Sequence, residues 1–153
     1  MNTQNKLPYA IIIGIDCVTG LQSARILARH GVPVIGLAKD PKNFCCKTKV
    51  CEKILQVNTA SEDLIVLLES LGTTLEQKAV LFPCTDMSVL TISRHRQRLV
   101  DRYHIALPEP DVVEMLMDKV SFYTYAQQKD LSIDKRPRLP FFTRSLMWGL
   151  NRI

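Results

Sequence analysis

The stretch that decides the fold is residues 9–38, YAIIIGIDCVTGLQSARILARHGVPVIGLA. Its two ends, residues 9–15 and 33–38, are short and nearly continuous apolar runs, which is typical of strands buried on both faces of a parallel sheet. From Leu21 onward apolar residues recur at helical spacing as far as Gly31, which is placed to end that helix. A strand, a helix and a second strand in this order predict a parallel crossover unit.

The same alternation continues along the chain. A polar, turn-rich segment (residues 40–52) follows, and further strands are expected at residues 53–57, 79–84 and 104–107. Helices are expected after a capping pair Thr59 and Glu62 with Gly72 as the end, over residues 87–103 with Asp86 as N-cap, around Asp111 and Glu114, and again from Asp118. Strands that alternate with helices predict an α/β fold with an open, mainly parallel sheet flanked by helices.

Charge is unevenly distributed in this chain of 153 residues, whose formal net charge is +5. Residues 134–153 hold five Lys and Arg against one Asp, so they carry +4 and leave only +1 for residues 1–133. The chain contains no apolar run of the roughly 18 residues that a membrane span needs, and its polar start does not resemble a secretory signal. We therefore expect a cytoplasmic protein that binds neither membranes nor nucleic acid.

Cysteine and histidine give little support for a metal centre. Five cysteines are an odd number, which favours free thiols in a reducing compartment over a disulfide framework. The group Cys45, Cys46 and Cys51 has no CxxC pair and no closely following His, and the three histidines lie far apart in sequence. We expect no metal site. The arginines between residues 94 and 102 are interpreted as the solvated face of a helix, because no aromatic residues alternate with them.

The turn GIDCVTG, residues 14–20, joins a buried strand to a helix N-terminus, where free backbone amides can hold an anion. It is not the GxGxxG fingerprint, since its glycines stand six residues apart and Asp16 would face a pyrophosphate. Three interpretations stay open: a purely structural turn, a loop that faces a ligand, and a dinucleotide site.

A second strand-to-helix junction, residues 83–86 (PCTD), should open on the same edge, because parallel strands end together. Thr85 and Asp86 could meet a substrate there, or Asp86 could simply cap its helix.

Taken in order, GIDCVTGLQSARILARHGVPVIGL, LFPCTD and LPEPDVVEMLMDKVSFYTYAQ resemble the N-terminal part of ATP-grasp ligases. The subgroup is the carboxylate–amine ligases, similar to the large subunit of carbamoyl-phosphate synthase, and the resemblance covers residues 8–133. It implies a Rossmann-like pre-ATP-grasp domain (residues 1–117), then a short stub of the ATP-grasp domain (residues 118–133). In this family the second domain opens with an Asp-Lys pair, here Asp118 and Lys119.

The resemblance also implies roles for individual residues. Lys119 would approach the phosphates of ATP, and six residues would lie on the substrate side: Gly14, Asp16, Thr19, Gly20, Thr85 and Asp86. The complete family enzyme uses ATP and Mg²⁺ to join a carboxylate to an amine through an acylphosphate. The Mg-binding residues and both ATP-enclosing lobes of that enzyme are not found in this sequence, so we assign no catalytic residue and expect the chain itself to bind no cofactor.

Residues 134–153 depart from the family pattern abruptly, and only 36 residues remain from Asp118 onward. We expect a truncated chain with an irregular, basic end that is read out of frame or otherwise unrelated. The resulting functional hypothesis is an inactive N-terminal fragment of an ATP-grasp ligase, which binds small carboxylates and amines. The alternative is a stand-alone small-molecule-binding or interaction module, and a third option is nucleic-acid binding through the basic end. Phe122, Tyr123 and Tyr125, with apolar residues of the basic end, would favour self-association if exposed.

Overall fold

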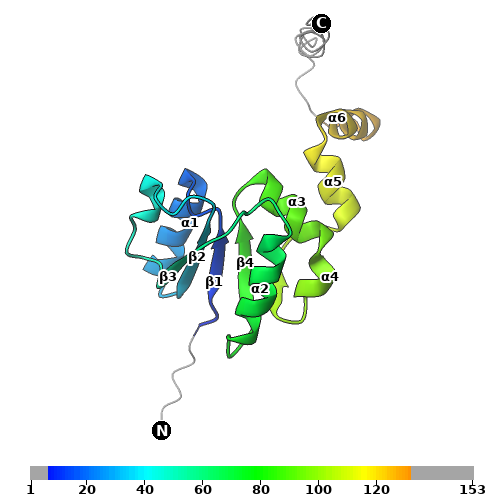
Figure 1. The fold of residues 1–153 in the computed structure, drawn as a ribbon. Coiled ribbons are helices and arrows are strands. Elements are labelled where there is room, and N and C mark those ends of the chain that lie inside the picture. Colours follow the sequence, from blue (N-terminus) through cyan, green and yellow to red (C-terminus); the bar gives the residue numbers. More distant parts are fainter. Residues whose placement is uncertain (1–6, 132–153) are drawn as a thin grey trace, which may run out of the picture. The chain divides into compact units, whose positions relative to one another are not determined.

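A five-stranded parallel sheet forms the centre of the protein in the computed structural model, which describes residues 7–131 (Figure 1). The strands are β1 (Ala10–Ile13), β2 (Val34–Ala38), β3 (Lys53–Gln56), β4 (Ala79–Pro83) and β5 (Tyr103–Ile105). They are ordered β3-β2-β1-β4-β5, and every neighbouring pair is parallel. The predicted α/β fold with an open parallel sheet is therefore confirmed, in a Rossmann-like arrangement.

Helices connect the strands as the alternating pattern predicts. They are α1 (Val18–Arg29), α2 (Asp63–Thr73), α3 (Asp86–Arg94), α4 (Arg96–Leu99), α5 (Pro110–Met117) and α6 (Lys119–Gln128). The segment between β2 and β3 contains only a short 3-10 helix, η1 (Phe44–Cys46). Gly31 adopts the left-handed conformation, with φ of +74°, directly after the last residues of α1, as expected of a helix-ending glycine.

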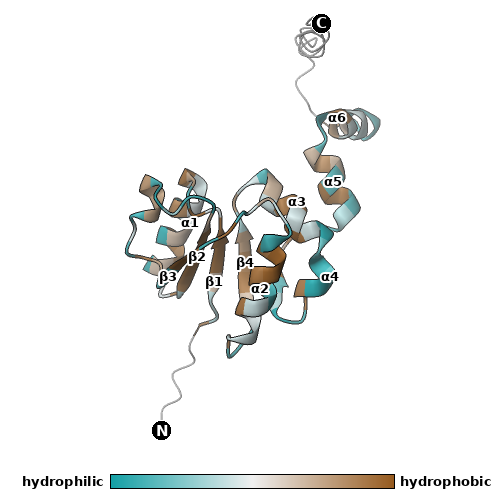
Figure 2. Cartoon of the chain, in the orientation of Figure 1, coloured by the Kyte–Doolittle hydropathy of each residue, from teal (hydrophilic) through white to brown (hydrophobic). Residues whose placement is uncertain are grey.

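Two apolar cores lie on the two faces of the sheet, because successive side chains of a strand point in opposite directions. From β1, Ile11 and Ile13 pack with apolar residues of α2, α3 and α4, while Ala10 and Ile12 pack with α1 and the segment that contains η1. Burial on both faces explains why the central strands are apolar throughout (Figure 2).

Tyr103 anchors β5 to α2. Its side chain is 1% exposed and its hydroxyl donates a hydrogen bond of 2.7 Å to the carbonyl oxygen of Leu68. Burial raises the pKa of this hydroxyl, so it stays a hydrogen-bond donor at ordinary pH. This bond satisfies the only polar atom of a side chain that is otherwise enclosed by apolar neighbours.

The expected start and end of α2 were wrong. Glu62 is already in helical conformation and makes no side-chain cap, while Thr59 is buried rather than placed at the helix start. Gly72 lies inside α2 instead of ending it. A Cβ at Gly72 would come within 2.9 Å of the Cβ of Arg102, so this glycine serves the close approach of α2 to the chain before β5.

The expected helix over residues 87–103 is also corrected. Thr85, not Asp86, is the N-cap of α3: it accepts from the amide of Ser88 (3.3 Å), and the hydroxyl of Ser88 accepts from the amide of Thr85 (3.1 Å). The helix then ends at His95, whose φ of −108° and ψ of 18° separate α3 from the single turn of α4. Asp118 likewise caps the end of α5, and α6 begins one residue later.

Three arginines of α3 and α4 tie helices together, so they are not a simple solvated face. Arg94 forms a bidentate ion pair with Glu114 of α5, at 2.6 and 3.0 Å. Arg98 pairs with Glu69 of α2 at 2.8 Å and with Glu62 at 2.7 Å. Arg96 donates to the carbonyl oxygens of Leu107 and Pro108 and pairs with Glu109. These contacts connect α3 and α4 to both α2 and the start of α5.

The Arg98–Glu69 pair predicts a specific titration. The hydrogen bonds from Arg98 lower the pKa of the Glu69 carboxyl below its ordinary value of 4.5. Substitution Arg98→Gln should return the Glu69 midpoint toward 4.5, whereas Glu114, whose pKa Arg94 lowers, should keep its midpoint. An NMR pH titration of the side-chain carboxyl carbons measures both.

The sign of this effect fixes its pH range. The pKa of the Glu69 carboxyl is lower in the folded protein than in the unfolded chain, so the ionised carboxylate stabilises the fold at any pH above the unfolded-state pKa. This stabilisation is lost as the pH falls through the folded-state pKa. The interpretation of Arg98 would be contradicted if the Glu69 midpoint were the same in the wild type and in Arg98→Gln.

The chain divides into two compact units, the first of which ends at Asp118 while the second begins at Lys119. In the second unit, the rings of Phe122 and Tyr123 pack edge to face, with centroids 6.3 Å apart, and Tyr125 is 40% exposed. The expected basic end, residues 134–153, lies outside the described residues.

Candidate functional site

The strand order creates a switch point between β1 and β4. The chain builds β2 and β3 on one side of β1, then crosses over to build β4 and β5 on the other side. The carboxyl ends of β1 and β4 lie next to each other, since Ile13 is paired with Pro83. In open α/β sheets, ligands bind in the crevice that opens outside the strand ends at such a point.

We use the term crevice for the region between the turn from β1 into α1 and the turn from β4 into α3, and we call these turns its first and second walls. Gly14, with φ of +93°, turns the chain so that its amide and that of Ile15 both donate to the carbonyl oxygen of Leu37, at 2.9 and 3.0 Å. Cys17 is the N-cap of α1, and its sulfur accepts from the amide of Gly20 at 3.3 Å. Within residues 7–131 the amides of Val18 and Thr19 have no hydrogen-bond acceptor, so they are available to a ligand.

The second wall is the turn from β4 into α3. The capping box of Thr85 and Ser88 fixes this helix start, and the hydroxyl of Ser88 also donates to the carbonyl oxygen of Thr85 at 2.7 Å. Among the described residues, the amides of Asp86 and Met87 find no acceptor and the exposed Asp86 carboxylate finds no donor. A negative side chain and two free donors therefore stand together at this helix start.

The two walls touch each other. A Cβ on Gly14 would lie 3.1 Å from the Cγ2 of Thr85, and the thiol of Cys17 lies 3.8 Å from the carbonyl oxygen of Cys84. The N-termini of α1 and α3 consequently open side by side at the carboxyl edge of the sheet (Figure 1). Gly14, Gly20 and Thr85, which the resemblance placed on the substrate side, thus lie in close contact. Asp16, Thr19 and Asp86 belong to the same two strand-to-helix junctions.

Asp16 differs from Asp86 in that its carboxylate already accepts hydrogen bonds within the protein. One carboxylate oxygen accepts from the backbone amides of both Lys39 and Asp40, each at 2.9 Å. Asp16 therefore fixes the segment after β2 to the turn after β1. This internal role was not foreseen from the sequence, in which residues 16 and 39 are far apart.

Lys119 lies in the other unit. It is the first residue of α6 and is exposed, while the six residues of the crevice all belong to the unit that ends at Asp118.

The thiol of Cys84, which follows β4 at the crevice, has low reactivity. Burial raises the pKa of Cys84 to about 11. A thiol with such a pKa is almost wholly protonated at neutral pH and is a poor nucleophile. Within residues 7–131 no cluster of three or more His, Cys, Asp or Glu side chains could hold a metal ion.

Sequence reasoning missed several groups of this site. Cys17 as a helix cap gave no signal, because sulfur is a weak acceptor and cysteine is not among the preferred capping residues. The Thr85 and Ser88 pair did offer one, since a hydroxyl residue followed three positions later by a polar side chain is the spacing of a capping box.

The sequence matches no protein-family model and no curated protein. None of the helices in the described part of the chain has the length and apolar character needed to cross a lipid bilayer.

Proposed function

We propose that the unit ending at Asp118 is the Rossmann-like, substrate-binding part of an ATP-grasp carboxylate–amine ligase. The observation that carries the proposal is the pair of helix N-termini that open together at the β1–β4 switch point. The family assignment itself comes from the resemblance of three sequence segments in the expected order. The unit boundary falls within the Asp-Lys pair with which the family's second domain opens, one residue after the expected boundary.

The chemistry of the crevice favours an amino acid or a similar small zwitterion. Free amides at a helix N-terminus, such as those of Val18 and Thr19, bind carboxylates well. The Asp86 carboxylate, which no described residue neutralises, would pair with the ammonium group of the same ligand. One ligand that carries both charges uses both walls of the crevice.

In the proposed reaction, a substrate carboxylate attacks the γ-phosphate of ATP, which forms an acylphosphate and releases ADP. An amine then attacks the acyl carbon, forms the amide bond and displaces phosphate. The residues of this chain would bind and orient the substrate, and Lys119 would contact the nucleotide phosphates through its compact positive charge. The described residues contain no Mg²⁺-binding cluster, so the proposal assigns none of them to a metal.

A second candidate is a stand-alone module that binds the same small molecule without catalysis. It is supported by the same pair of helix N-termini, which can hold a small charged molecule whether or not a reaction follows. The two candidates share the crevice and differ in whether the chain also binds ATP.

Isothermal titration calorimetry of the full chain tests both. The titrants are the standard amino acids, then ATP with Mg²⁺. The ligase proposal predicts saturable binding of an amino acid. Saturable binding of ATP that Lys119→Ala weakens would favour this proposal over the module, and it would overturn the expectation that the chain itself binds no cofactor. If an amino acid binds but ATP does not, the result favours the module. If no titrant shows saturable binding, both candidates are contradicted.

A further inference from the structure

The described part of the chain is electrically divided, although its net charge is small. Residues 7–53 contain seven Lys and Arg against three Asp and Glu, a net charge of +4. Residues 54–118 contain five against ten, a net charge of −5. The positive part holds β1, α1, β2 and the segment before β3, while the negative part holds the helices from α2 to α5.

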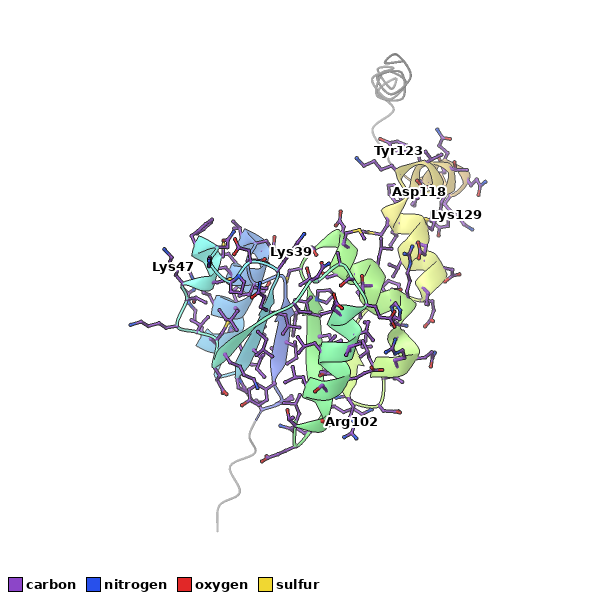
Figure 3. All side chains as sticks on the ribbon, viewed as in Figure 1. Lys39, Lys47, Arg102, Asp118, Tyr123 and Lys129 are labelled. Atoms are coloured by element: carbon purple, nitrogen blue, oxygen red, sulfur yellow. The ribbon has the colours of Figure 1, made fainter. Side chains whose placement is uncertain are left out.

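Ion pairing sharpens this division. The arginines of the negative part are used internally, as in the pairs Arg94–Glu114 and Arg98–Glu69. By contrast, the ammonium groups of the four lysines between β2 and β3 have no ion-pair partner within residues 7–131; they are Lys39, Lys42, Lys47 and Lys49. All four are exposed. Figure 3 labels Lys39 and Lys47 in this segment.

The lysine segment, residues 39–50, has a defined conformation. Asn43 accepts from the amide of Cys45 at 2.9 Å and begins η1, and Asp40 accepts from the amide of Lys42 at 3.0 Å. The Cys45 side chain is 1% exposed, and Val50 packs into the core on the α1 face of the sheet. The segment is thus fastened to the domain at several points.

Phe44 is turned outward by this conformation. It is 68% exposed, whereas its neighbour Cys45 is buried. An exposed ring on a segment whose backbone is held in place presents a flat surface on which a base can stack. In the sequence Phe44 lies between Lys42 and Lys47, which are both exposed, so an aromatic ring and positive charges occur in one short segment.

The lysine segment also runs beside α1. Because β2 and β3 are parallel, the chain between them must return from the carboxyl edge of the sheet to the amino edge. α1 makes the same return, and it contacts η1. Arg25, Ala28 and Arg29 of α1 line a shallow depression of about 380 Å³ together with Val50. Positive side chains therefore follow the return path from Lys39 to Arg29.

We propose that this surface, formed by Arg25, Arg29, Lys39, Lys42, Phe44, Lys47 and Lys49, binds single-stranded nucleic acid. A basic track that neutralises phosphates, together with an exposed ring on which a base can stack, is the common design of such surfaces. The depression beside Val50 gives room for a sugar or base, which the flat surface of an anionic bilayer would not fill. This surface borders the crevice at Lys39, whose amide is held by Asp16, but the proposal does not depend on the function of the crevice.

The test is fluorescence anisotropy of the full chain with a labelled oligouridylate of about twelve nucleotides, over a series of salt concentrations. The double variant Lys47→Gln/Lys49→Gln removes two positive charges from the surface. It should weaken binding roughly 50-fold at 50 mM salt. The plot of the logarithm of the association constant against the logarithm of the salt concentration should become less steep, by about 1.4. The matched control Lys78→Gln/Arg102→Gln removes two positive charges from the negative part and should retain the wild-type affinity.

Phe44→Ala separates stacking from charge. It should weaken binding by at least about fivefold with the salt slope unchanged. Because Phe44 is exposed, the variant should keep the wild-type circular dichroism and melting curve. Equal affinity and slope in the lysine double variant would overturn the proposal, since binding would then come from elsewhere in the chain. Binding to phosphatidylserine vesicles without binding to the oligonucleotide would overturn it as well.

Discussion

Replacement of Gly20 by alanine should lower the free energy of unfolding by about 3 kcal/mol. Helix propensity alone predicts the opposite, since alanine in a helix interior is worth about 1 kcal/mol more than glycine. A Cβ at Gly20, however, would lie 2.2 Å from the carbonyl oxygen of Gly14 and 2.9 Å from the Cα of Ile15. These are backbone atoms, so α1 would have to move away from the turn after β1.

The matched control is Gly31→Ala. A Cβ at Gly31 would meet nothing within 4 Å, and only its left-handed conformation, with φ of +74°, disfavours alanine. We expect a loss of about 1–2 kcal/mol there. Urea denaturation monitored by circular dichroism measures both variants. Unfolding free energy in Gly20→Ala equal to that of the wild type would contradict the close packing of α1 on this turn.

Substitution Asp86→Asn should weaken binding of the amino-acid ligand at least tenfold. Its carboxylate is the charged group of the crevice that no described residue neutralises, and a charge-assisted hydrogen bond contributes about 1.5–3 kcal/mol. Asparagine keeps the size of the side chain and removes the charge, so the loss should fall on ligands that carry an ammonium group. Calorimetry with the ligand found for the wild type, and with its analogue lacking the amine, measures this.

Asp111→Asn provides the control for Asp86→Asn. Asp111 is likewise an exposed aspartate in the first turn of a helix, but it belongs to α5 rather than to the crevice. Both variants lose a similar interaction with a helix dipole, so their melting temperatures should fall alike. If Asp111→Asn lost as much affinity as Asp86→Asn, the carboxylate of Asp86 would have no specific role.

The sheet was predictable because its strands are buried on both faces. Residues 9–15 and 33–38 are almost wholly apolar, which is typical of strands buried on both faces. The helix between them indicates that the two strands are parallel, as they are. Helix boundaries were less predictable. Asp86 and Thr85 are both good caps, and only the backbone conformation of Thr85 decides between them.

The remaining errors concern contacts between distant parts of the chain. Nothing local in the sequence shows that Asp16 holds the amides of Lys39 and Asp40, or that Gly72 is required by the approach of Arg102. The same applies to Arg94, whose partner Glu114 is 20 residues away. The net charge of the described part likewise does not show its charge distribution, since positive and negative regions cancel in the total.

The central claim is that a small zwitterion binds at the β1–β4 switch point. Two-dimensional ¹H–¹⁵N NMR of the labelled full chain, titrated with the amino acid that calorimetry identifies, tests it most directly. The account predicts that the amide signals of Val18, Thr19, Asp86 and Met87 shift together and saturate together. Shifts confined to other residues, such as those at the amino edge of the sheet around Tyr9 and Glu52, would contradict it.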